Sequence, residues 1–334
     1  MNKSFLSKLT AAVERNGSLL CIGLDPDPHQ FPDHFASATP ARPVDGQALL
    51  AWGRRIMEQT ADLACCYKPN SAFYEQFGAQ GIEALRQTIA AAPDDIPVLL
   101  DAKRGDIGST AAAYARAAFE ALGADAVTLS PYLGRDSVAP FLAYPGKMAF
   151  VLCYTSNPSA ATIQEAQAGD GERPLPLFER VVREALTWGG PEQIGLVVGA
   201  TQPLALARVR QLLAGQPRWI LAPGVGVQGG DLSQALAAGL DAAGSGLLIP
   251  VSRQVIYAAD PRAAAQALRA AIRAGREPSQ RIAPTNNEQP SPFPSPPPSF
   301  PSFPSPPSSL ILALHEAGCV QFGQFTLASG VQSP

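Results

Sequence analysis

The chain has 334 residues, of which 46% are hydrophobic, and it carries a formal net charge of −3. This length allows one large domain or two of ordinary size, with enough apolar residues for a substantial core. The small charge gives no indication of a nucleic-acid partner or of an anionic membrane. The polar N-terminus lacks the apolar segment of a secretory signal, and no stretch reaches the ~18 apolar residues of a membrane span.

The cysteines are scattered along the chain, and most lie in apolar, strand-like runs. Their spacing fits neither a disulfide framework nor a metal site, which favours a reducing, cytoplasmic location. They are Cys21, Cys65, Cys66, Cys153 and Cys319.

Apolar strand-like runs alternate with Ala- and Leu-rich helical stretches before residue 277. Continuous apolar strands alternating with helices predict a parallel sheet that is covered on both faces. Eight such units predict an α/β fold of the (β/α)8 TIM-barrel type, with a doubly wound open sheet as the alternative. The strand candidates are residues 19–25, 64–70, 97–103, 126–130, 148–155, 194–200, 219–224 and 246–252, and the helix candidates include 47–63, 71–91, 109–122 and 204–213.

The composition changes sharply after the last helical stretch. Residues 277–309 are rich in Pro and Ser, which favours extended polyproline II and predicts a disordered, solvated linker. Residues 310–334 are too few to bury a core of their own and read as the opening of another domain that has been cut off. The predicted organisation is therefore a barrel at 1–276, a linker at 277–309 and a C-terminal fragment at 310–334.

Charged side chains end three neighbouring strand candidates. Asp101 and Lys103 in DAKRGDIGST alternate along one strand and so face the same side. Lys68 ends the second candidate and Asp25 the first. Any one of them could be a surface ion pair or a solvated strand end. Because active sites of TIM barrels lie at the carboxyl ends of the strands, their coincidence predicts a catalytic site there.

The last two strand candidates end in features that suit a phosphate. The segment APGVGVQGGD at residues 222–231 is a glycine-rich turn, which lets the backbone approach an anion closely. Ser252 and Arg253 follow the eighth strand, and arginine offers a forked set of donors to phosphate oxygens. This is the common phosphate position of TIM barrels, so the sequence predicts a phosphorylated small molecule as ligand.

The same motifs resemble those of the orotidine 5′-phosphate decarboxylase family in its longer bacterial form. GLDPD, YKPNSAFYE, DAKRGDIGST, APGVGVQGGD and PVSRQVI occur in the family's order over residues 19–256. The resemblance implies a TIM-barrel lyase that converts orotidine 5′-phosphate to UMP and CO2, the last step of de novo UMP synthesis. It also implies that the reaction needs no cofactor and no metal.

The resemblance assigns the catalytic positions residue by residue. Lys103 would protonate C6 of the pyrimidine, and Asp101 would lie beside the substrate carboxylate. Lys68, Asp101, Lys103 and Asp106 would form an array of alternating charge. Asp106 and Thr110 would reach into the neighbouring subunit's site, which implies a homodimer.

The resemblance assigns binding roles in the same way. Asp25 and Lys68 would hold the ribose hydroxyls, and Ser156 would contact the pyrimidine. Residues 157–173 would form part of a closing lid. The phosphate would be held by side chains and backbone amides at Gln228, Gly229, Ser252 and Arg253.

The C-terminal segment LALHEAGCVQFGQFTLASGVQSP resembles the beginning of orotate phosphoribosyltransferase. The resemblance implies a decarboxylase–transferase fusion that is broken off early and does not itself transfer phosphoribose. The alternative is a chance amphipathic helix followed by a loop.

Two other functions compete with decarboxylation of orotidine 5′-phosphate. The first is a metal-dependent sister barrel acting on a sugar phosphate, which would need a carboxylate where this chain has Lys68. The second is a non-catalytic dimerising scaffold for a fused transferase. Against the scaffold, every catalytic position carried over from the family is occupied.

Overall fold

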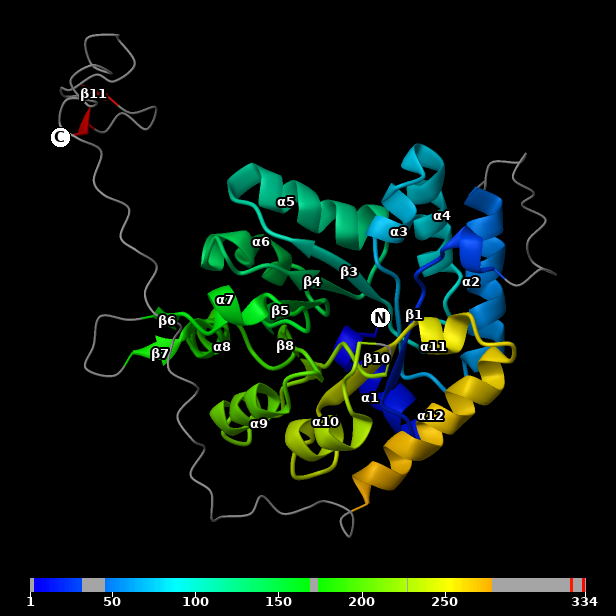
Figure 1. The fold of residues 1–334 in the computed structure, drawn as a ribbon. Coiled ribbons are helices and arrows are strands. Elements are labelled where there is room, and N and C mark those ends of the chain that lie inside the picture. The colour runs from blue at the N-terminus through cyan, green and yellow to red at the C-terminus, as the bar shows by residue number, and fades with distance from the viewer. Residues whose placement is uncertain are drawn as a thin grey trace, which may run out of the picture. The chain divides into compact units, whose positions relative to one another are not determined.

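The computed structural model describes residues 3–31, 46–168, 174–226 and 228–277, with two short strands near the C-terminus (Figure 1). The chain divides into two units, Met1–Ile282 and Ala283–Pro334. In the second unit, β11 (Phe325–Thr326) pairs antiparallel with β12 (Gln332–Ser333). The predicted linker, except Glu277, and the rest of the C-terminal fragment lie outside the described residues.

Eight parallel strands of the described residues form one sheet in the order β2-β1-β10-β9-β8-β5-β4-β3. Parallel bridges from Tyr67 to Val98 and from Asn70 to Asp101 join its two edge strands and close the barrel. The TIM-barrel prediction is therefore confirmed, and the open-sheet alternative is wrong. Each strand overlaps its predicted range: β1 (Leu20–Gly23), β2 (Cys66–Lys68), β3 (Leu99–Arg104), β4 (Ala126–Leu129), β5 (Met148–Tyr154), β8 (Ile194–Val198), β9 (Ile220–Leu221) and β10 (Leu247–Val251).

Helices surround the strands in Figure 1, as a sheet with two apolar faces requires. The longer ones are α1 (Phe5–Asn16), α2 (Gly46–Thr60), α4 (Gly78–Ala90), α5 (Gly108–Arg116), α8 (Leu177–Trp188), α9 (Pro203–Leu212), α10 (Leu232–Gly239) and α12 (Pro261–Arg276). Short elements join them: α3 (Ala72–Glu75), α6 (Ala139–Leu142), α7 (Ala160–Gln164), α11 (Arg253–Ile256), η1 (Pro28–Gln30), η2 (Ala117–Ala121), η3 (Arg135–Ser137) and the hairpin of β6 (Gln167–Ala168) and β7 (Leu175–Pro176).

The single helix predicted at residues 71–91 is wrong, because the chain forms α3 and α4 with a break between them. Gly78 stands at the break with φ of 61°, a left-handed conformation that a side chain disfavours. The helix predicted at 109–122 is present but loosens into the π-turn η2 in its last part.

Helix α1 covers the end of the barrel where the strands begin. The amide of Phe5 donates to the carbonyl of Gly146 just before β5, and Lys8 Nζ lies 3.2 Å from Asp125 just before β4. The Phe5 ring packs edge to face on Phe150 of β5, with centroids 5.8 Å apart. With this end covered, the opposite mouth of the barrel is where a ligand can enter.

In the part of the chain that the structure describes, no helix combines the length and apolar character needed to cross a bilayer. The cysteines described there are buried and free: Cys21, Cys65, Cys66 and Cys153.

Candidate active site

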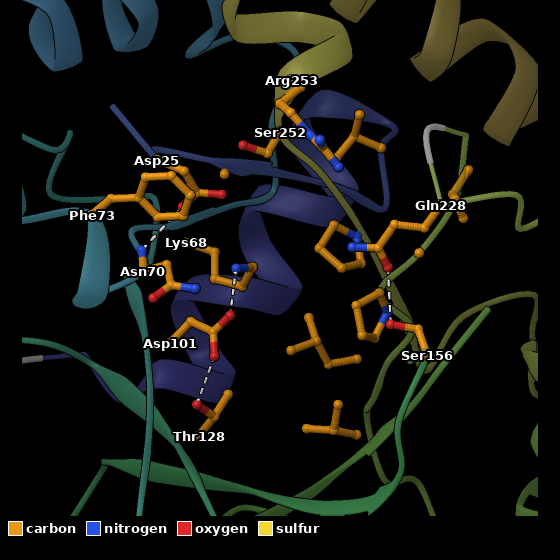
Figure 2. A pocket seen from close by; sticks show the side chains of 18 of the residues that line it. Asp25, Lys68, Asn70, Phe73, Asp101, Thr128, Ser156, Gln228, Ser252 and Arg253 are labelled. Atoms are coloured by element: carbon orange, nitrogen blue, oxygen red, sulfur yellow. Dashed lines mark hydrogen bonds and ion pairs between the residues drawn. The ribbon is translucent and has the colours of Figure 1, made fainter. Parts of the chain in front are cut away.

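A cavity of about 650 Å³ lies at the carboxyl ends of the barrel strands. This volume is in the range of sites that bind small molecules. Most of the residues singled out from the sequence line this cavity, and Figure 2 labels all of these except Lys103. Those that line it are Asp25, Lys68, Asp101, Lys103, Ser156, Gln228, Ser252 and Arg253.

Asp101 is the centre of a compact charged group on one wall of the cavity. Its Oδ2 accepts a hydrogen bond from Lys68 Nζ at 2.8 Å, and its Oδ1 accepts one from Lys103 Nζ at 2.6 Å. A third donor, Thr128 Oγ1 of β4, lies 2.9 Å from the same Oδ1 (Figure 2). The side chains of Lys68 and Asp101 are 9% and 12% exposed, whereas that of Lys103 is 48% exposed and reaches into the open cavity.

The charges of this group maintain one another against burial. Burial alone would lower the pKa of Lys68, but the carboxylates of Asp101 and Asp25 outweigh it and hold that pKa above its ordinary value. Burial would likewise raise the pKa of Asp101, but the ammonium groups of Lys68 and Lys103 hold it well below its ordinary value. Both members of the buried pair are therefore ionised at neutral pH.

Asp25 lies beside this group at the end of β1. Its Oδ1 accepts a hydrogen bond from the amide of Asn70 at 3.1 Å, and its carbonyl accepts one from the hydroxyl of Tyr257 at 2.8 Å. Gly23 permits this packing, because a Cβ there would lie 2.7 Å from Ser252 Cβ. The first and last strands therefore bring Asp25 and Ser252 to one side of the cavity.

Ser156 and Gln228 form the facing side of the cavity in Figure 2. Ser156 Oγ donates to Gln228 Oε1 at 2.9 Å. Gly224, with φ of 107°, turns the chain so that a Cβ there would lie 3.1 Å from Ser156 Cβ. Ser252 and Arg253 lie at the same mouth (Figure 2), so the cavity combines uncharged donors and a guanidinium with the charged wall.

Three predicted residues do not line the cavity. Asp106 and Thr110 lie outside it, and the Asp106 carboxylate accepts a hydrogen bond from the amide of Ile107. Gly229 is also outside, although its neighbour Gln228 lines the cavity. Of the predicted lid at 157–173, residues 157–168 include α7 and β6, and 169–173 lie outside the described residues.

Sequence reasoning missed Thr128 and Tyr257, which also line the cavity. Thr128 is polar in the otherwise apolar stretch AVTL, which is a usable signal for a buried polar contact. Tyr257 lies just past the PVSRQVI motif, and no local pattern distinguishes it from a core aromatic.

Over the described ranges, no group of three or more His, Cys, Asp or Glu side chains is placed to hold a metal ion. The carboxylate of Asp101 contacts two ammonium groups instead.

Comparisons with known proteins agree on one family. The model of the orotidine 5′-phosphate decarboxylase / HUMPS family matches residues 18–268. Orotidine 5′-phosphate decarboxylase of Thermomicrobium roseum is 48% identical over 84% of this chain and 96% of its own. The structure of Leishmania donovani OMP decarboxylase, 47% identical, superposes with a TM-score of 0.70 over 82% of this chain and 98% of that one. The bifunctional enzyme PyrF/PyrE of Nostoc is 41% identical, covering 99% of this chain and 65% of its own length.

Replacing Asp101 with Asn should destabilise the protein, because it removes the nearest counter-ion of a buried ammonium. We expect a loss of about 3–5 kcal/mol in the free energy of unfolding at pH 7, measured by urea denaturation. In the wild type, a depressed pKa means that the contribution of Asp101 is present above its ordinary value of 3.8 and is lost as pH falls through the lowered value. The variant should lack this acid-dependent loss.

The matched control is Asp62→Asn, which breaks the exposed pair between Asp62 and Arg262. Exposed pairs contribute little, so this variant should lose much less stability. Equal losses in the two variants would contradict the buried-pair interpretation.

Proposed function

The chain belongs to the orotidine 5′-phosphate decarboxylase / HUMPS family, and we propose that its cavity decarboxylates orotidine 5′-phosphate to UMP and CO2. The observation that carries the proposal is the Lys68–Asp101–Lys103 group at the mouth of the barrel. It places two ammonium groups and a carboxylate around one point of a cavity of suitable size. Curated decarboxylases that are nearly half identical over most of the chain support the same reaction.

The chemistry requires a group that stabilises charge and then supplies a proton. When the bond between C6 and the carboxylate breaks, its electron pair remains on C6 of the pyrimidine. The Lys103 ammonium can stabilise this charge and then transfer a proton from Nζ to C6. Its side chain is half-exposed in the cavity, whereas that of Lys68 is only 9% exposed.

Asp101 orients both lysines, because its two oxygens accept one ammonium each. In this role it separates the two like charges that would otherwise repel each other. A substrate carboxylate beside Asp101 would add a second negative charge to the site. Its departure as neutral CO2 would remove the repulsion between the two carboxylates.

The remaining predicted residues fit the rest of the nucleotide. Asp25 and Lys68 would hold the ribose. On the facing side, Ser156 would contact the pyrimidine and Gln228 the phosphate. Arg253 and Ser252, with backbone amides near Gly229, would bind the phosphate. Contacts to this remote group can also lower the barrier, by closing the lid and positioning the ring.

A metal-dependent reaction on a sugar phosphate, as in a sister barrel, is the less suitable function for this site. Such a barrel would place a metal-binding carboxylate where Lys68 lies, and an ammonium group cannot ligate a cation. The donor set of the described residues thus favours orotidine 5′-phosphate over a metal-bound sugar phosphate.

We propose a homodimer in which Asp106 and Thr110 complete the neighbouring site. Both lie outside their own chain's cavity. Ile107, the chain neighbour of Asp106, is 57% exposed, and Tyr132 and Leu133, which follow β4, are 85% and 48% exposed. An apolar surface of this kind is typical of an interface between subunits.

The C-terminal segment 310–334 is proposed to correspond to the start of an orotate phosphoribosyltransferase-like part. The match to the Nostoc bifunctional enzyme supports this correspondence, because it extends over 99% of this chain.

A reducing, cytoplasmic location also remains a prediction, and the free buried thiols favour it.

Loss of orotidine 5′-phosphate absorbance tests the reaction directly. We expect wild-type turnover in excess EDTA, and a loss of about 10²- to 10⁴-fold or more in Lys103→Ala, because the general acid is gone. Binding of UMP to the variant should persist. Turnover that stops with EDTA would favour the metal-dependent sister barrel, and a folded wild type that binds UMP without turnover would favour the scaffold.

Subunit mixing tests the shared site. Lys103→Ala and Asp106→Ala should each be inactive alone. If Asp106 acts on the neighbouring site, mixed dimers contain one site with both native residues. Because about half of the dimers are mixed and each has one intact site, re-equilibrated mixtures should recover about a quarter of wild-type activity. No recovery from dimers shown to exchange would place Asp106 in its own chain's site, and an Asp106→Ala variant that is active alone would place it outside any site.

A further inference from the structure

Thr128 lies at an irregularity of the barrel next to the charged group. In the pairing of β3 with β4, Leu100 lies opposite Val127 and Arg104 lies opposite Leu129. On the β4 side, the three residues from Asp101 to Lys103 therefore lie opposite a single residue, Thr128. A bulge of this kind leaves backbone groups without ladder partners and redirects side chains.

The hydroxyl of Thr128 compensates for the missing ladder bonds. The amides of Ala102 and Lys103 both donate to Thr128 Oγ1, each at 3.0 Å. The same hydroxyl donates to Asp101 Oδ1 at 2.9 Å. A hydroxyl has one proton to donate and two lone pairs, so all its hydrogen-bonding capacity is used and its orientation is fixed.

The bulge also holds Lys103 in an unusual backbone conformation. Its φ is 47°, in the left-handed region that residues with a side chain rarely adopt. Such a conformation persists only where the surroundings impose it. The Lys103 amide bonded to Thr128 is a contact that does so, and it sets the direction in which the lysine side chain leaves the strand.

We propose that Thr128 is a positioning residue for the decarboxylation, acting through both Asp101 and Lys103. It is 1% exposed, and its single hydroxyl joins the carboxylate that orients the lysines to the backbone of the proton donor. This inference rests on the proposed function, since it concerns the geometry of the same reaction. The uncharged side chain of Thr128 thereby fixes the direction of the charged side chain of Lys103.

The test compares Thr128→Val, which keeps the shape but removes the hydroxyl, with Thr128→Ser, which keeps the hydroxyl. We expect Thr128→Val to lose about 10- to 100-fold in kcat, because a small displacement of a catalytic group is costly. KM for orotidine 5′-phosphate and the affinity for UMP should not change, since the nucleotide-binding side chains remain. Thr128→Ser should retain nearly wild-type kcat.

Thr60→Val is the matched control, because it removes another buried threonine hydroxyl. Thr60 Oγ1 bonds the carbonyl of Ile56 and the hydroxyl of Tyr67, away from the cavity lining. It should lower the melting temperature without lowering kcat. If Thr128→Val fails to fold, Thr128→Cys replaces it with the same expected loss, because a thiol is a weak hydrogen-bonding group.

The outcomes separate this inference from the proposed function. A folded wild type that does not consume orotidine 5′-phosphate would refute the function itself. An active wild type whose Thr128→Val variant has unchanged kcat would refute the positioning role alone. Equal losses of kcat in Thr128→Val and Thr128→Ser would also refute the positioning role. They would show that the packing of the threonine side chain matters and its hydroxyl does not.

Discussion

The site depends on the ion pairs that the Asp101 carboxylate makes with Lys68 and Lys103. They hold two like charges close together, although Lys68 and Asp101 are mostly buried. Without the carboxylate, the ammonium groups of Lys68 and Lys103 would repel each other, and burial would favour neutral Lys68. With it, the buried pair of Lys68 and Asp101 is ionised at neutral pH. The charges of this pair are thus in place before any substrate arrives, as electrostatic catalysis requires.

The barrel makes this arrangement possible through the order of its strands. β2, β3 and β4 are neighbours in the sheet. Their carboxyl ends therefore place Lys68, Asp101 and Thr128 side by side. The remaining strands bring Ser156 and Gln228 to the facing side of the same cavity and Arg253 to its mouth. A long ligand can span the cavity, with its reacting end at the charged wall and its anionic end at the arginine.

Much of this could be predicted from the sequence, because strand periodicity and charge are local signals. Continuous apolar runs marked the eight strands, and charged strand ends marked Asp25, Lys68 and Asp101. The break between α3 and α4 was missed because Gly78 is tolerated in a helical pattern until its left-handed conformation is seen. Thr128 was missed for a different reason. Its role depends on a bulge in the neighbouring strand, and strand register is not a local property. Asp106 and Thr110 lie outside the cavity of their own chain, so the role proposed for them requires a second subunit.

Chemical rescue is the measurement that bears most closely on proton transfer from an ammonium group at position 103 to C6. The Lys103 side chain is 48% exposed, so a small amine can reach the space it leaves in Lys103→Ala. If Lys103 is the proton donor, we expect ethylammonium to restore decarboxylation to this variant in proportion to the concentration of the protonated amine. Wild-type turnover by Lys103→Ala without any amine would contradict it.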